Sequence, residues 1–185
     1  MKQISIRFCG FGGQGIVLSA VVLGTAAVTK AGLHAVQTQS YGSEARGGQC
    51  QAELIIWDRP INSPDVAMKD VLVAMSQSAL DRYLPSLKED GVLIIDPGLV
   101  TNTHGTKARV LEVPATETAQ RLGNRICANM VILGFVQAAT NMISKEDLVE
   151  VVKDSVPARF LDLNLRAVDA GIELAKGISL EVLGS

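Results

Sequence analysis

Cysteine is scarce and widely spaced in this 185-residue sequence. The three cysteines, Cys9, Cys50 and Cys127, form no Cys-x-x-Cys pair, which argues against a disulfide framework, a zinc site and an iron–sulfur cluster. This use of cysteine is typical of a protein kept in reducing surroundings. We therefore expect a cytoplasmic location.

Aromatic residues and an excess of charge are also lacking. Only 4% of the residues are aromatic, and the formal net charge is −2 with no basic run along the chain. This charge balance argues against binding to nucleic acid or to an anionic membrane surface. Apolar residues make up 48% of the chain, so we expect one globular domain with a core of Val, Leu, Ile and Ala.

Long hydrophobic segments are few. The uncharged run of residues 8–29 follows Lys2 and Arg7 and superficially resembles a signal peptide, but its first half is a glycine-rich loop rather than an apolar core. No second stretch reaches the roughly 18 residues that a membrane-spanning helix needs. We therefore expect neither secretion nor insertion into a membrane.

Short apolar or β-branched runs alternate with longer helical patterns along the chain. The expected strands are residues 4–9, 34–38, 50–57, 71–75, 92–95 and 109–113. The expected helices are residues 16–30, 78–87, 114–122, 126–141, 144–153 and 158–176. The order strand, helix, strand predicts an α/β fold, namely a single Rossmann-like domain of three αβα layers with a mainly parallel sheet.

The ends of the domain and one of its helices need separate comment. We assign residues 1–177 to the domain, and residues 178–185 to a tail that fits no element and could have been added in cloning. Residues 126–137 are apolar on nearly every face, which suits either a central core helix, slightly favoured, or a helix against another subunit. In the core, Asn129 and Gln137 would need buried partners.

A glycine-rich loop separates the first strand from the first helix. Gly10, Gly12 and Gly15 fit Gly-x-Gly-x-x-Gly, where backbone amides and a helix N-terminus can hold a phosphate. A tight turn explains the same glycines equally well. A dinucleotide site would also need a carboxylate about 20 residues further on, but no acidic residue precedes Glu44. The evidence for a nicotinamide cofactor is therefore poor.

A second polar loop, YGSEARGGQ, spans residues 41–49. Its glycines permit unusual backbone angles, and Glu44 and Arg46 lie two residues apart. Because loops that follow adjacent parallel strands emerge at one edge of a sheet, Arg46 could approach the first loop and bind a phosphate through two hydrogen bonds. The alternative is a solvated loop in which Glu44 and Arg46 pair with each other.

Together, GFGGQGI near the N-terminus and SYGSEARGG resemble the gamma subunit of 2-oxoacid:ferredoxin oxidoreductases, over roughly residues 4–176. The second motif is more similar to the 2-oxoglutarate branch than to the pyruvate branch. The resemblance implies oxidative decarboxylation of a 2-oxoacid with coenzyme A, giving acyl-CoA, CO2 and reduced ferredoxin. It also implies that thiamine diphosphate, Mg2+ and iron–sulfur clusters lie on partner chains, the alpha, beta and, where present, delta subunits, and that ferredoxin is met there.

The sequence itself offers no obvious nucleophile and base. Its only histidines are His34, in a strand pattern that favours a structural role, and His104, in a loop. We therefore expect no catalytic residue, no metal site and an inactive isolated chain that contributes to assembly and to part of a coenzyme A site. The expected site residues are Gly10, Gly12, Gly13, Gln14, Gly15, Ser40, Tyr41, Gly42, Glu44, Arg46 and Gly47.

Two other functions fit the same motifs. The first is a free-standing Rossmann-type enzyme that binds NAD or a flavin, which the missing ribose carboxylate disfavours. The second is an assembly module that binds no ligand, in which the glycines serve turns and subunit contacts.

Overall fold

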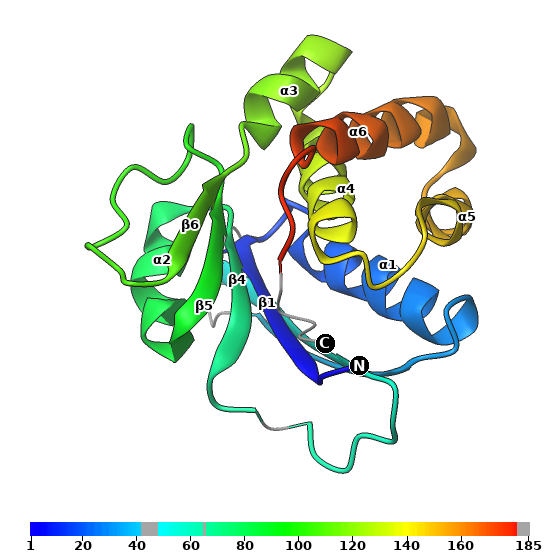
Figure 1. Ribbon diagram of the computed structural model, residues 1–185. Coiled ribbons are helices and arrows are strands. Elements are labelled where there is room, and N and C mark those ends of the chain that lie inside the picture. The colour runs from blue at the N-terminus through cyan, green and yellow to red at the C-terminus, as the bar shows by residue number, and fades with distance from the viewer. Residues whose placement is uncertain (42–47, 65, 181–185) are drawn as a thin grey trace.

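One sheet of six strands, in the order β2-β3-β1-β4-β5-β6, organises the residues that the computed structural model describes, 1–41, 48–64 and 66–180 (Figure 1). The strands are β1 (Ile4–Phe11), β2 (His34–Tyr41), β3 (Gln49–Trp57), β4 (Lys69–Ala74), β5 (Leu87–Ile95) and β6 (Arg109–Glu112). The helices are α1 (Ile16–Thr29), α2 (Gln77–Tyr83), α3 (Ala115–Leu122), α4 (Ala128–Thr140), α5 (Lys145–Ser155) and α6 (Leu161–Leu174). Single 3-10 turns occupy Leu84–Ser86, Arg125–Cys127 and Ala158–Phe160.

The sheet combines a parallel part with an antiparallel hairpin. Strands β1, β4, β5 and β6 run parallel, whereas β3 is antiparallel to both β1 and β2. The prediction of a mainly parallel sheet is therefore confirmed. The prediction treated the first two strands as parallel neighbours, which was wrong, because β3 lies between β1 and β2.

Helices cover both faces of the sheet, which confirms the three-layer prediction (Figure 1). Helices α1, α4, α5 and α6 lie on one face over the larger apolar cluster, which includes Ile6, Leu54 and Phe135. Helix α2 covers a smaller cluster on the other face, where Leu72, Leu80 and Leu93 are buried. Strand β4 is buried at every position because it lies between the two clusters.

Two predicted helices are clearly shorter than expected. The last, expected over residues 158–176, begins with a 3-10 turn and spans Leu161–Leu174. The expected helix of residues 78–87 ends at Tyr83 and gives way to a 3-10 turn. Pro85 explains the early end, because proline lacks an N–H and disfavours helical backbone in the residue before it. Strand β5 then begins at Leu87, five residues before the apolar run that predicted it.

Helix α4 is a core helix, which settles the choice left open by its sequence. All its residues but Ala138 are buried within this chain, and Gln137 donates from Nε2 to the Ile143 carbonyl at 2.8 Å. Two glycines, Gly134 of α4 and Gly171 of α6, allow the helices to cross with their backbones in contact. Within the described ranges, each helix falls short of the length and hydrophobicity that crossing a membrane requires.

The start of the C-terminal tail packs against the domain. The N–H of Leu180 donates to the carbonyl of Ala139 in α4 at 2.8 Å, and the Leu180 side chain is buried. The carbonyl of Ser179 accepts a hydrogen bond from Arg109 of β6 at 3.1 Å. Leu180 therefore belongs to the core, and the partly buried Ile178 packs against it.

Candidate functional site

The glycine loop connects the end of β1 to the start of α1, as predicted. Gly13 and Gly15 have φ angles of 93° and 75°, in the left-handed region that favours glycine. Gly15 is the N-cap of α1, and neither a side-chain cap nor an acidic residue occupies the first turn. The N–H groups of that turn have no intrahelical partner, so this end of the helix favours an anion.

Two side chains fix the loop from within the protein. Gln14 accepts from the Phe11 N–H through Oε1 at 2.6 Å and donates from Nε2 to the Met75 carbonyl at 2.8 Å. Asn129 of α4 is buried against Gly15 and donates to its carbonyl at 3.5 Å, which gives Asn129 the partner that its burial requires. A Cβ at Gly15 would meet the Asn129 amide at under 3.0 Å.

The second predicted loop joins the glycine loop through the backbone. The N–H of Gly12 donates to the carbonyl of Gly48, just before β3, at 3.0 Å. Ser40 and Tyr41 end β2 and are exposed. Four expected site residues, Gly42, Glu44, Arg46 and Gly47, lie outside the described residues, so their roles stay predictions.

A pocket of about 340 Å3 opens beside the glycine loop. Its lining includes Gly13, Gln14, Met75, Thr116, Arg125 and Ile126. The first two follow β1, Met75 follows β4, Thr116 lies in α3 after β6, and the last two belong to the 3-10 turn before α4. The pocket therefore lies at the carboxyl ends of the parallel strands, where α/β proteins bind ligands.

Arg125 is the charged pocket residue that the sequence analysis missed. It belongs to a 3-10 turn whose start is capped by Asn124, through a 3.0 Å bond from the Ile126 N–H to Oδ1. Among the described residues, no carboxylate forms an ion pair with Arg125. A fixed turn therefore presents an available guanidinium to the pocket, next to the exposed side chain of Ile126.

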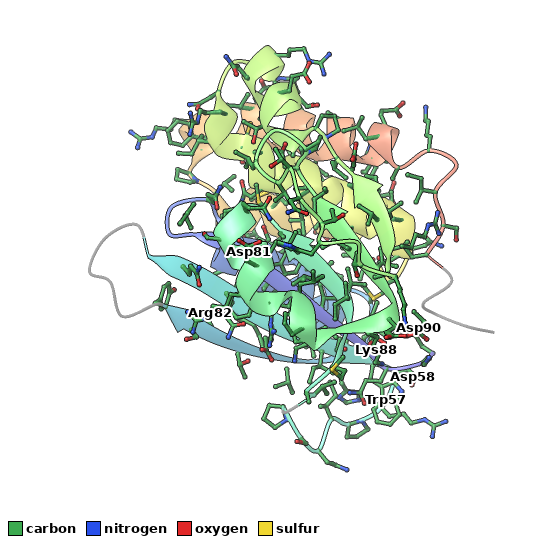
Figure 2. All side chains as sticks on the ribbon, turned by 90° about the vertical axis from the view of Figure 1, so that its left-hand side faces the viewer. Trp57, Asp58, Asp81, Arg82, Lys88 and Asp90 are labelled. Atoms are coloured by element: carbon green, nitrogen blue, oxygen red, sulfur yellow. The ribbon has the colours of Figure 1, made fainter. Side chains whose placement is uncertain are left out.

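Neither histidine belongs to this pocket. His34 is exposed at the start of β2, and His104 bonds through Nε2 to Asp81 Oδ1 at 2.7 Å. Hydrogen bonds from His104 and Gln77 hold the pKa of Asp81 below its ordinary value. In Figure 2, where α2 faces the viewer, Asp81 and Arg82 lie on one side of the molecule, and Lys88 and Asp90 on the other.

The thiols are poorly suited to nucleophilic chemistry. All three cysteines are free and buried. Burial raises the pKa of Cys9 to about 12, although nearby Arg7 opposes the shift. Burial also raises the pKa of Cys50 and of Cys127.

The described residues at the pocket offer backbone amides and one arginine, a combination that suits an anionic ligand.

Comparison with known proteins identifies the family. Residues 5–174 match the family model described as pyruvate ferredoxin/flavodoxin oxidoreductase. The chain belongs to this family. It is 47% identical to 2-oxoglutarate synthase subunit KorC of Methanothermobacter thermautotrophicus over 91% of this chain and 93% of that subunit. The resemblance predicted from the two glycine motifs is confirmed.

Two solved structures of the family have the same fold. The gamma subunit of a keto/oxoacid ferredoxin oxidoreductase from Geobacter sulfurreducens aligns with a TM-score of 0.83 and 40% identity, over 94% of this chain and 99% of that one. A 2-oxoglutarate:ferredoxin oxidoreductase from Magnetococcus marinus, solved with 2-oxoglutarate, coenzyme A and succinyl-CoA bound, aligns with a TM-score of 0.88 and 26% identity. That match covers 97% of this chain but 32% of the larger polypeptide.

Proposed function

We propose that this chain is the gamma subunit of a multi-subunit 2-oxoglutarate:ferredoxin oxidoreductase, in which it contributes to assembly and forms part of the coenzyme A site. The complex decarboxylates the 2-oxoacid oxidatively and transfers the acyl group to coenzyme A, and ferredoxin takes up the electrons. The 47% identity to a 2-oxoglutarate synthase subunit supports this substrate.

The observation that carries the coenzyme A proposal is the placement of Arg125 and the glycine loop around one pocket. Coenzyme A carries a pyrophosphate and a further phosphate. Backbone N–H groups at a helix N-terminus and a free guanidinium are groups that recognise phosphate. The pocket is smaller than the whole ligand, so we propose that it holds the phosphate end and that the thiol extends toward a partner chain.

Partner chains supply the remaining chemistry in this proposal. The Magnetococcus polypeptide extends well beyond the part that this chain matches, and we propose that separate alpha, beta and, where present, delta subunits provide such parts here. Thiamine diphosphate, Mg2+ and the iron–sulfur clusters would lie on those chains, where ferredoxin also docks. The isolated chain is accordingly expected to show no 2-oxoacid oxidation.

The test is Arg125→Ala in the assembled complex. Loss of one charge-assisted hydrogen bond typically costs about 1.5–3 kcal/mol, so the Michaelis constant for coenzyme A should rise roughly ten- to a hundredfold. The constant for 2-oxoglutarate should stay unchanged, because decarboxylation precedes acyl transfer. Steady-state kinetics with each substrate varied in turn measure both constants, and Arg46→Ala is expected to behave in the same way.

Arg121→Ala is the matched control. Arg121 is an exposed residue of α3 that pairs with Glu117 at 3.5 Å, one turn away, and it does not line the pocket. It should change neither constant. If Arg125→Ala assembles normally and leaves the coenzyme A constant at the wild-type value, the coenzyme A proposal is wrong and the assembly module is favoured.

A further inference from the structure

The carboxamide of Gln14 joins three backbone segments that meet at the pocket. The Met75 N–H donates to the Cys9 carbonyl at 2.8 Å, which continues the pairing of β1 and β4. The Met75 carbonyl accepts from Gln14 Nε2 at 2.8 Å, and Gln14 Oε1 accepts from the Phe11 N–H at 2.6 Å. One side chain thus ties the glycine loop to the ends of both strands.

The space for this carboxamide exists because residue 10 is a glycine. A Cβ at Gly10 would meet Gln14 Oε1 and Ile16 Cδ1 at under 3.0 Å. Gly10 has no positive φ angle, so its backbone conformation does not itself demand glycine. The demand comes from the Gln14 side chain and the tight packing around it.

A loop with this composition needs an internal support. Gly12, Gly13 and Gly15 give the backbone many alternative conformations, and ordering them costs conformational entropy. The planar carboxamide of Gln14 carries both a donor, which bonds to the Met75 carbonyl, and an acceptor, which bonds to the Phe11 N–H. Among the common side chains of this length only glutamine offers both, because an ionised glutamate lacks the donor, and methionine lacks the donor and has only a weakly accepting sulfur.

We infer that Gln14 is a positioning residue, which holds the glycine loop in the conformation that binds phosphate. This inference rests on the proposed coenzyme A site and specifies how Gln14, one of the expected site residues, would contribute to it. Gln14 acts through the loop backbone, and its two bonded polar atoms are directed at Phe11 and Met75.

Gln14→Ala and Gln14→Glu in the assembled complex test the inference. Loss of both bonds should raise the Michaelis constant for coenzyme A about tenfold in Gln14→Ala. Gln14→Glu should raise it at least as much, because the carboxylate faces the Met75 carbonyl without a donor and adds negative charge beside the pocket. The constant for 2-oxoglutarate should not change, and Gln120→Ala, at an exposed position on α3, should leave both constants unaltered.

The Gly10→Ala variant tests the contact itself. Its methyl group displaces the carboxamide, so this variant should also raise the coenzyme A constant. In the Gln14→Ala background the main obstacle is gone, and Gly10→Ala should then raise the constant by a smaller factor than in the wild type. Equal factors in both backgrounds would overturn the inference, because they would mean that the two positions act separately.

Amide hydrogen exchange supplies a readout that does not depend on coenzyme A. In the complex, the Phe11 amide, followed in peptides that contain it, should exchange at least about tenfold faster in Gln14→Ala than in the wild type, because its N–H loses an acceptor. Unchanged exchange would contradict the inference. If Arg125→Ala raises the Michaelis constant for coenzyme A and Gln14→Ala does not, the role of Gln14 is wrong but the coenzyme A site stands. If Arg125→Ala leaves that constant unchanged while Gln14→Ala speeds exchange, the coenzyme A site is wrong.

Discussion

Gly171→Ala is expected to lower the free energy of unfolding by about 3 kcal/mol or more. A Cβ at Gly171 of α6 would lie under 3.0 Å from the Val131 carbonyl oxygen and the Phe135 nitrogen of α4. These are backbone atoms of a buried helix, so they cannot rotate away as the end of a side chain can. The helices would have to separate, and both lose close packing. Chemical denaturation of the purified protein measures the effect.

Gly134→Ala should behave in the same way, because a Cβ there would meet the backbone of Val168 in α6 at under 3.0 Å. The control is Gly32→Ala. Gly32 has a φ of 67°, and a Cβ there has no neighbour within 4 Å, so alanine should cost only the roughly 1–2 kcal/mol of a left-handed conformation. Equal losses at Gly32 and Gly171 would show that the helix crossing tolerates a methyl group.

Much of the fold follows from local patterns. The apolar run within 71–75 predicted a strand buried on both faces, and β4 has that position between two apolar clusters. The polar start of β5 was missed, because Lys88, Glu89 and Asp90 carry no strand pattern. They lie at a register shift, between the pairs that Leu87 and Val92 form with Lys69 and Val71 of β4. The antiparallel pairing of β2 and β3 could have been predicted from the length of the connection between them. The expected strands 34–38 and 50–57 are separated by fewer residues than the dozen or more that a parallel crossover needs.

The candidate site was harder to predict than the fold. The glycine loop is a local motif, so its place between a strand and a helix was visible in the sequence. Arg125 was not, because more than 100 residues separate it from Gly13 and only the packing of α4 brings both to one pocket. The sequence also could not tell whether Gln14 faces a ligand or the protein, because a loop of four glycines has no periodicity that fixes side-chain direction.

Glu53→Ala is expected to destabilise the protein by about 3–5 kcal/mol, the usual cost of leaving a buried charge unpaired. Glu53 of β3 lies between two cations, Arg7 of β1 and Lys69 of β4, and its Oε2 is 2.7 Å from Lys69 Nζ. The Lys69 side chain is 2% exposed. In the variant, the Val66 carbonyl is the one remaining recorded partner of its ammonium group among the described residues. The denaturation midpoint at neutral pH measures the loss.

Two further variants separate the buried charge from other causes. Glu89→Ala breaks an exposed pair with Lys107, whose side chain is 74% exposed, and should cost no more than about 1 kcal/mol. Adding Lys69→Met to Glu53→Ala removes the unpaired ammonium, so the double variant should be more stable than Glu53→Ala alone. A double variant less stable than the single one would contradict the account, because it would mean that Lys69 stabilises the fold without its carboxylate.

The pH dependence of stability should follow from the same carboxylate. Burial tends to raise the pKa of Glu53, but hydrogen bonds from Lys69 and Arg7 outweigh burial, so the pKa lies below its ordinary value. A lowered folded-state pKa means that the unfolded chain takes up a proton first. The contribution of Glu53 is therefore complete above the ordinary glutamate pKa of about 4.3 and is lost as pH falls through the lower folded value. Glu53→Ala should reduce the acid-induced loss of stability without abolishing it, because other carboxyl groups also have lowered pKa values. One of them is Asp70, where hydrogen bonds from Lys88 and Ser5 outweigh burial. An unchanged stability difference between wild type and Glu53→Ala from pH 7 to pH 3 would contradict the account, because it would mean that the pKa of Glu53 is the same in the folded and unfolded states.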